Sequence, residues 1–242
     1  MNAIVITLSL LSACAPLPAH SAAIVIDRSD SLSLEDLCDA VAGITESELA
    51  SPNLDSRSTI QVWITGDGRN GGARQIVPPT AIPVARSALA GSASVQGKKA
   101  ALLQTVIDAC LHDVVPASTS PIYDAVDNAA RSVSRGPGDD STLWVVSDLQ
   151  ENVEPGLTVA IAGEVGAKDG AHPRSRSRTV PMQPAPTPVI DASGLTIHAC
   201  GYGRTSNGVI SREDRDRTMA AWTPVLEGAT AFVFDPACPS KS

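Results

Sequence analysis

Two runs of apolar and β-branched residues constrain the fold of this chain more than any other feature of its sequence. They are AAIVI at 22–26 and TLWVV at 142–146. A strand that is apolar on both faces is typical of a parallel sheet with helices packed on each side. We therefore predict that 22–26 is the first and central strand of such a sheet.

Helical segments alternate with the predicted strands. Apolar residues at helical spacing predict helices over 31–43, 98–112, 121–133 and 212–226. Gly43 is expected to end the first helix, and Trp222 is expected to anchor the last one in the core. Further strands are predicted over 59–65, 195–199 and 230–234, with a glycine-rich hairpin after 65 whose proline-containing return arm, 74–83, lies at a sheet edge. The alternation predicts an α/β fold with a mainly parallel central sheet and helices on both faces.

The composition fits one globular domain with one large loop. Of the 242 residues, 43% are hydrophobic and 18% are charged, which is enough apolar material for a core. The segment 150–193 is rich in Pro, Ser, Gly and Arg, and we predict that it is a flexible insertion. The formal net charge of −8 argues against a nucleic-acid partner, because binding to phosphate backbones needs a basic surface.

The N-terminal residues indicate export. The apolar run 3–13 is too short to span a membrane and is typical of a signal peptide. It ends in Leu11-Ser12-Ala13-Cys14, which resembles a bacterial lipobox and implies acylation of Cys14, with 14–21 as a tether. The alternative is ordinary cleavage within 18–23. The expected location is periplasmic or outer-membrane, with a lipid anchor in the membrane.

Four further cysteines remain: Cys38, Cys110, Cys200 and Cys238. An even number in an exported chain suggests two disulfides, for which three connectivities exist. The alternative is that they are small buried thiols.

Three clusters of oxygen-bearing side chains lie next to predicted strands or helices, at positions expected to meet at one edge of the sheet. They are Asp27, Ser29 and Ser31 after the first strand, Ser118 to Ser120 before a helix, and Ser147-Asp148 after TLWVV. Ligands of open α/β sheets bind beyond the carboxyl ends of the strands. Hydroxyl and carboxylate oxygens are ligands for a hard cation such as Mg²⁺. The alternative is that these residues only cap helices.

The motif D-x-S-x-S, a hydroxyl before P-I-Y-D-A and a later strand-terminal Asp together resemble the von Willebrand factor A (VWA) domain and its metal-ion-dependent adhesion site. The resemblance covers roughly 22–238 and implies a Rossmann-like VWA fold. It implies that Ser29, Ser31 and Ser120 ligate Mg²⁺, or else Mn²⁺ or Ca²⁺, and that Asp27 and Asp148 accept hydrogen bonds from its waters. Thr119 is the alternative to Ser120, because the family usually has Thr before the Pro. The family often has Gly directly after this last Asp, whereas this chain has Leu149 after Asp148.

The predicted elements place Cys38 and Cys110 near one end of the sheet, and Cys200 and Cys238 after its last two strands. The pairs Cys38–Cys110 and Cys200–Cys238 are therefore preferred among the three connectivities.

The resemblance implies a metal-dependent, adhesion-type protein-binding module of the cell envelope, in which a partner's Asp or Glu carboxylate completes the cation's shell. The alternative is a scaffold component of an envelope or secretion assembly with a vestigial metal site. An enzyme is not expected, because the sequence has no G-x-S-x-G, H-E-x-x-H or Walker motif. A phosphohydrolase of the Asp-nucleophile type would need a second Asp where Ser29 stands.

Overall fold

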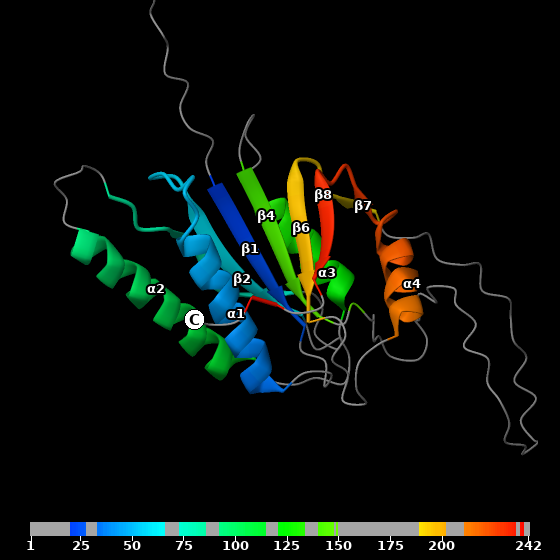
Figure 1. Cartoon of the computed structure of the whole chain (residues 1–242), viewed down its shortest axis with the longest axis horizontal. Helices are drawn as coiled ribbons and strands as arrows, with labels where there is room; N and C mark the ends of the chain where they lie inside the picture. Colours follow the sequence, from blue (N-terminus) through cyan, green and yellow to red (C-terminus); the bar gives the residue numbers. More distant parts are fainter. Residues whose placement is uncertain are drawn as a thin grey trace, which may run out of the picture.

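A central six-stranded sheet organises the protein (Figure 1). The computed structural model describes residues 20–27, 33–65, 73–85, 92–114, 121–133, 140–147, 149, 189–201, 211–235 and 238–239. The strand order is β3-β2-β1-β4-β6-β8. The strands are β1 (His20–Ile26), β2 (Thr59–Ile64), β3 (Arg74–Ala81), β4 (Asp140–Val146), β6 (Leu195–Cys200) and β8 (Ala231–Asp235).

All neighbouring strands of this sheet run parallel except β2 and β3, which are antiparallel. β3 lies at one edge, as its prolines predicted, because proline cannot donate to a further strand. The predicted α/β fold with a mainly parallel sheet is therefore confirmed, and β1 lies in the interior of the sheet as expected.

The side chains of β1 alternate between two cores. Ala22, Ile24 and Ile26 pack under α1 (Leu34–Leu49) and α2 (Ser92–Asp113), whereas Ala23 and Val25 pack against α3 (Ile122–Ser132) on the opposite face. α4 (Arg212–Trp222) lies beside the β8 end of the sheet (Figure 1). Helices thus cover both faces, which explains why the segment Ala22–Ile26 of β1 is apolar throughout.

The first helix is longer than predicted, because Gly43 does not end it. α1 continues to Leu49, and Gly43 is itself buried within it. A glycine inside a helix costs about 1 kcal/mol relative to alanine. The residues that follow outweigh this cost, because Ile44, Glu48 and Leu49 are all buried.

Other predicted boundaries are also wrong. α2 begins at Ser92, six residues before the predicted start at 98. β1 begins at His20, so His20 and Ser21 belong to the sheet and not to the tether; both are buried. α4 ends at Trp222, because Pro224 cannot continue a helix. The predicted insertion ends earlier than 193.

The end of the insertion is defined by a second, two-stranded sheet. β5 (Ile190–Asp191) pairs in parallel with β7 (Leu226–Glu227). The backbone N–H of Ile190 donates to the carbonyl of Val225 at 2.7 Å, and that of Ala192 donates to Glu227 at 2.8 Å. These bonds and the burial of Ile190 and Ala192 fix this part of the chain. Residues 150–188 lie outside the described residues.

Residues 1–19, including the predicted signal segment and Cys14, also lie outside the described residues. Among the helices that the structure does describe, none is both long and apolar enough to cross a membrane.

Candidate metal centre

Asp27 lies at the carboxyl edge of the sheet, directly after β1, and its position is set by pairing with β4. Ile26 and Val146 are register partners, and the backbone N–H of Asp27 continues the ladder by donating to the carbonyl of Val146 at 3.0 Å. Ser147, the next residue of β4's chain, donates its hydroxyl to the Asp27 carboxylate (Oγ to Oδ2, 2.6 Å). Both side chains are buried. The ends of β1 and β4 are therefore joined by a short hydrogen bond to a carboxylate, which is a strong type.

The turn after Ser147 is held by Leu149. Its φ of 59° lies in the left-handed region, which favours glycine. The Leu149 N–H donates to the Ser147 hydroxyl oxygen at 2.8 Å, and its carbonyl accepts a hydrogen bond from the Trp222 indole N–H at 3.1 Å. Leu149 is also fully buried. This chain therefore forms, with leucine, a turn that is suited to glycine, which is the residue that the resembled family often has after its last Asp.

Trp222 connects that turn to the start of α3. Its ring stacks on Tyr123, with centroids 4.5 Å apart and planes inclined by 19°. Tyr123 lies in the first turn of α3, two residues after Pro121. Trp222 is 1% exposed, so the prediction of a core anchor is confirmed. One aromatic pair thus ties the segment that follows Ser120 to the segment that follows Asp148.

Of the predicted cation ligands, the structure describes Asp27 alone. The other predicted ligands lie outside the described residues; they are Ser29, Ser31, Thr119, Ser120 and Asp148. The structure does describe residues beside them in the sequence, which are Asp27, Ser147, Leu149 and Pro121. Within the described part of the chain, no three His, Cys, Asp or Glu side chains are grouped to hold a metal. A buried carboxylate and flanking hydroxyl-bearing residues are hard oxygen donors, and this donor chemistry fits Mg²⁺ or Ca²⁺.

Sequence reasoning named Ser147 and Trp222 but did not predict the contacts that they make at this face. Ser147 was grouped with Asp148 in one cluster of oxygen-bearing side chains, but the hydrogen bond from its hydroxyl to Asp27 was not expected. Trp222 was expected in the core, but its bond to the Leu149 carbonyl was not. The one local signal for the role of Ser147 was its place in the sequence, between the predicted strand 142–146 and Asp148.

Two disulfides lie at this edge of the sheet. Cys38 of α1 is bonded to Cys110 of α2, and Cys200 at the end of β6 is bonded to Cys238. These are the two pairs that the predicted placement of the elements favoured. The first joins the two helices on one face, and the second fixes the chain after β8 to the end of β6.

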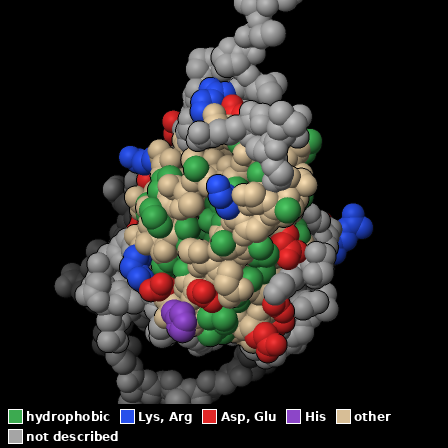
Figure 2. Space-filling model, turned by 90° about the vertical axis from the view of Figure 1, so that its left-hand side faces the viewer, with side chains coloured by type: hydrophobic (Ala, Val, Ile, Leu, Met, Phe, Trp, Pro, Cys, Tyr) green, Lys and Arg blue, Asp and Glu red, His purple; other side chains and the backbone are tan. Residues whose placement is uncertain are grey.

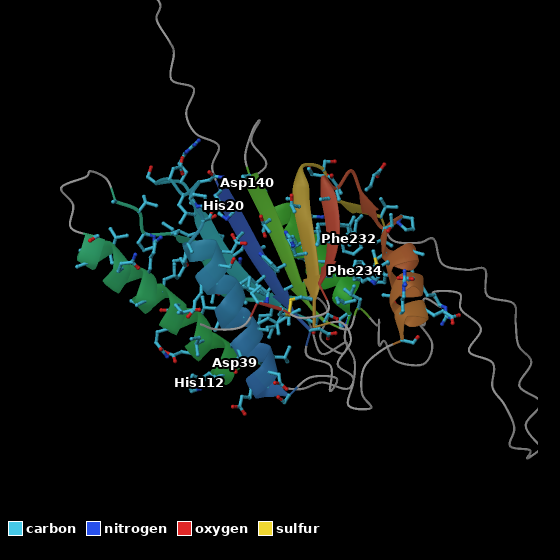
Figure 3. The ribbon with its side chains drawn as sticks, in the orientation of Figure 1. His20, Asp39, His112, Asp140, Phe232 and Phe234 are labelled. Carbon is cyan, nitrogen blue, oxygen red and sulfur yellow. A yellow bond between two sulfur atoms is a disulfide. The ribbon has the colours of Figure 1, made fainter. Side chains whose placement is uncertain are left out.

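A different polar cluster lies at the opposite edge of the sheet, where β1 and β4 begin. The buried His20 ring (Nε2) lies 2.5 Å from Oε2 of Glu48, which is also buried, and Trp144 donates its indole N–H to Oε1 of Glu48 at 2.6 Å. Nδ1 of His20 lies 3.4 Å from the Asp140 carboxylate. Figure 3 shows His20 and Asp140 at the end of the sheet away from Asp39 and His112.

The Glu48 hydrogen bond raises the pKa of His20 above its ordinary value of 6.5, with help from the charges of Glu48 and Asp140 and against the opposing effect of burial. The protonated imidazolium is therefore favoured in the folded protein, because it neutralises a buried carboxylate.

Comparison with protein-family models gave no match, and comparison with curated proteins gave none. Solved structures of similar fold were found. A serine-substituted form of an aerotolerance-related membrane protein from Bacteroides fragilis is 16% identical, over 89% of this chain and 91% of that chain, with a TM-score of 0.41. BatB from Bacteroides thetaiotaomicron is 14% identical over 90% of each chain, also with a TM-score of 0.41.

The von Willebrand factor domain of the type V pilus tip protein Mfa5 from Porphyromonas gingivalis is 11% identical, over 91% of this chain and 90% of that chain, with a TM-score of 0.46. Its description names the family that the sequence motifs resemble.

Proposed function

We propose that this protein is an exported, non-catalytic binding module that holds a divalent cation, Mg²⁺ in the first instance, at the carboxyl edge of its sheet. The cation would be held by Ser29, Ser31 and Ser120, or Thr119 in place of Ser120. Asp27 and Asp148 would accept hydrogen bonds from its waters. An Asp or Glu carboxylate of a protein partner would complete the coordination shell.

The observation that supports the proposal is a continuous chain of contacts between the flanks of all three ligand loops. Asp27 accepts from Ser147, Ser147 accepts from Leu149, Leu149 accepts from Trp222, and Trp222 stacks on Tyr123. These contacts hold the ends of the three loops together at one edge. A site that draws its ligands from three loops needs such support, because a small displacement of one ligand weakens the whole shell.

The role of the cation in the proposal is to supply positive charge for a partner carboxylate. The chain's own residues orient it: the buried Asp27 carboxylate is fixed by the Ser147 hydroxyl before any partner arrives. The net charge of −8 would otherwise repel an acidic partner. The proposal therefore ties binding of an acidic partner to the presence of the cation.

Thermal unfolding in Mg²⁺ and in EDTA tests the proposal. At a Mg²⁺ concentration 100 times Kd, a ligand that binds only the folded protein adds about 2.7 kcal/mol of stability. For a domain of this size that is a rise in Tm of roughly 5–10 °C. The Ser29→Ala and Ser31→Ala double variant should lose this rise, whereas Ser51→Ala and Ser56→Ala, a matched loss of two hydroxyls elsewhere, should keep it.

Isothermal titration calorimetry with MgCl₂, MnCl₂ and CaCl₂ gives the second readout. The proposal expects uptake of one cation by the wild-type protein and by the control, and none by the Ser29/Ser31 variant. Equal melting of the wild-type protein in Mg²⁺ and EDTA, together with no heat of binding for any of the three ions, would refute it.

We also propose that the protein is anchored in the envelope through an acylated Cys14. The proposal rests on the lipobox-like Leu11–Cys14 sequence, which lies outside the described residues, and on the two disulfides, which are typical of an oxidising compartment. Mass spectrometry of the protein from a bacterial membrane fraction should detect the acylated cysteine, and Cys14→Ser should release the protein into the soluble fraction.

A further inference from the structure

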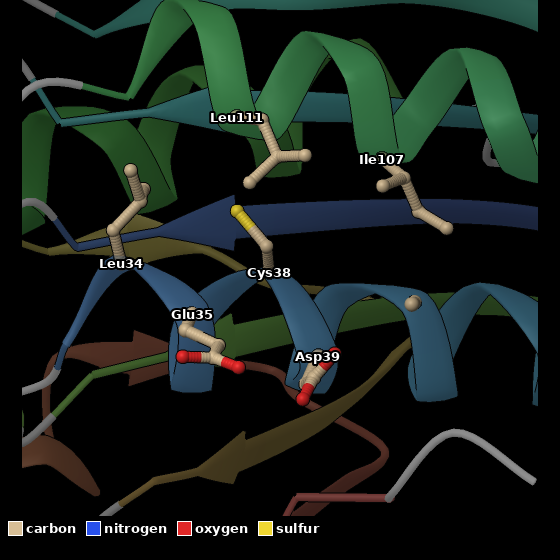
Figure 4. Close-up of a pocket in the computed structure, with 7 residues that line it drawn as sticks. Leu34, Glu35, Cys38, Asp39, Ile107 and Leu111 are labelled. Carbon is tan, nitrogen blue, oxygen red and sulfur yellow. The ribbon is translucent and has the colours of Figure 1, made fainter.

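A groove lies between the beginning of α1 and the end of α2, close to the edge that carries Asp27 (Figure 4). Its volume is about 480 Å³. The residues that matter for its chemistry are Leu34, Glu35, Cys38 and Asp39 of α1 and Ile107 and Leu111 of α2. This volume accepts side chains but not a whole helix or strand, so a binding segment would lie across the groove and insert side chains into it.

The groove has an apolar side and an acidic side, and the two have the same spacing. Ile107 and Leu111 extend from α2 towards α1, while Glu35 and Asp39 lie along α1 (Figure 4). Each pair is four residues apart, which is about 6 Å along a helix axis. Leu111 is 48% exposed, which is unusual for a large apolar side chain in the described part of this protein. Two parallel rows of different chemistry are therefore presented to solvent.

The acidic row carries charge that the described part of the chain does not neutralise. The sequence of α1 contains no Lys or Arg. Asp36 is engaged by the capping residue Ser33, and Asp113 at the end of α2 is paired with Arg74. Among the described residues, neither Glu35 nor Asp39 forms an ion pair. Figure 2, which views the molecule from the α2 side, shows carboxylates gathered at the lower end of this face below exposed apolar side chains.

A disulfide and buried side chains hold the two helices of the groove together. The Cys38–Cys110 disulfide joins the two helices at its base, and Cys38 itself lines the groove. Val41 and Val106, from the facing sides of the same helices, are fully buried in the core beneath. A preformed groove avoids the cost of ordering a surface on binding, so even a small contact area can hold a partner.

From these features we infer that the groove binds an amphipathic helix of a partner protein. That helix would present one row of aliphatic side chains at intervals of four residues and, beside it, a row of Lys or Arg with the same interval. The aliphatic row would insert between Ile107 and Leu111, and the basic row would pair with Glu35 and Asp39. This second contact does not depend on the proposed cation, because none of the groove residues is a proposed ligand.

Fluorescence anisotropy with synthetic helices tests the inference on the full chain. The probe is the labelled, acetylated peptide AKALRAALRAALRAA, with Leu and Arg in adjacent rows. One control peptide has Glu in place of each Arg, and another has Ser in place of each Leu. The first peptide should bind saturably, with a Kd that is equal in Mg²⁺ and EDTA. Both control peptides should bind at least about tenfold more weakly, which corresponds to about 1.4 kcal/mol.

Variants of the protein locate the binding. Glu35→Lys with Asp39→Lys should raise the Kd for the Leu/Arg peptide at least about tenfold. The matched control is Glu213→Lys with Asp216→Lys on α4, which makes the same change in net charge and should leave the Kd unchanged. Leu111→Ser should also weaken binding. Should the double reversal not fold, Glu35→Gln with Asp39→Asn replaces it, and circular dichroism confirms the fold of each variant.

The inference would be overturned by the absence of saturable binding by the Leu/Arg peptide, by equal binding of the Ser-containing peptide, or by equal loss of affinity in the α4 control. If sedimentation instead shows a dimer that Leu111→Ser dissociates, the groove joins two copies of this chain and the partner helix is wrong. Loss of peptide binding in EDTA would assign the peptide to the cation site and not to the groove. Failure of the cation proposal alone leaves the peptide result unchanged.

Discussion

The buried pair of His20 and Glu48 makes the stability of this protein depend on pH in a defined direction. The hydrogen bond from Glu48 raises the folded-state pKa of His20 above 6.5, so the folded protein holds this proton more tightly than the unfolded chain does. The stabilisation is complete below about pH 6.5 and is lost as the pH rises through the folded-state pKa. Over that interval the free energy of unfolding should fall by as much as about 1.4 kcal/mol per pH unit.

The size of the effect follows from burial on both sides of the pair. His20 is 4% exposed and Glu48 is 6% exposed, so water cannot replace either partner. Removing one partner of a buried pair leaves an uncompensated charge and costs about 3–5 kcal/mol. His20→Ala should therefore destabilise the protein by roughly this amount at pH 6, where Glu48 would keep only its bond from Trp144. His20→Gln should cost less, because its amide can still donate to Glu48.

Urea unfolding between pH 5.5 and 9, in buffer that contains EDTA, measures this linkage. The wild-type protein should lose stability as the pH rises above about 6.5, and His20→Gln should remove most of that slope. His112→Gln is the control, because His112 is exposed on α2 and tests whether the loss of any histidine has the same effect. If His20→Gln retains the wild-type slope, the proton is not bound by this pair and the reasoning is wrong.

Two further predictions concern the edge that carries Asp27. Leu149→Gly relieves a left-handed backbone but removes a buried side chain, so it should destabilise the protein by about 1–4 kcal/mol. Leu149→Ala loses the same packing and keeps the strain, so chemical denaturation should find it less stable than the Gly variant; the reverse order would show that φ does not matter here. Replacing Cys38 and Cys110 by serine opens a loop of 72 residues and should cost about 4 kcal/mol in urea unfolding. A loss below about 1 kcal/mol would contradict the loop-entropy argument.

The strands and the layer arrangement could be predicted because they depend on local patterns. A strand that is buried on both faces is mostly apolar, as Ala22–Ile26 of β1 is, and a continuous apolar run of this length between polar residues is typical of such a strand. Asp27, which directly follows β1, could be found in the same way, because a polar residue directly after such a strand lies at the carboxyl edge.

What could not be predicted depends on contacts between residues that are distant in sequence. The pair Ile190–Asp191 forms a strand only because Leu226–Glu227 lies beside it, and two residues carry no periodic signal. Gly43 was expected to end a helix, yet buried residues beyond it extend α1. The roles of His20, Leu149 and Asp27 depend on partners that are 28, 73 and 120 positions away in the sequence. These partners are Glu48, Trp222 and Ser147, respectively.

The direction of β1 relates the two edges of the sheet to the proposed membrane anchor. β1 begins at His20 on one edge and delivers Asp27 to the other, a rise of about 20 Å for a strand of this length. Cys14 precedes His20 by six positions, and six residues span at most about 20 Å. Acylation at Cys14 would therefore keep the His20 edge near the bilayer. The Asp27 edge, with the α1–α2 groove close to it, would face away from the membrane, where a protein partner can reach both.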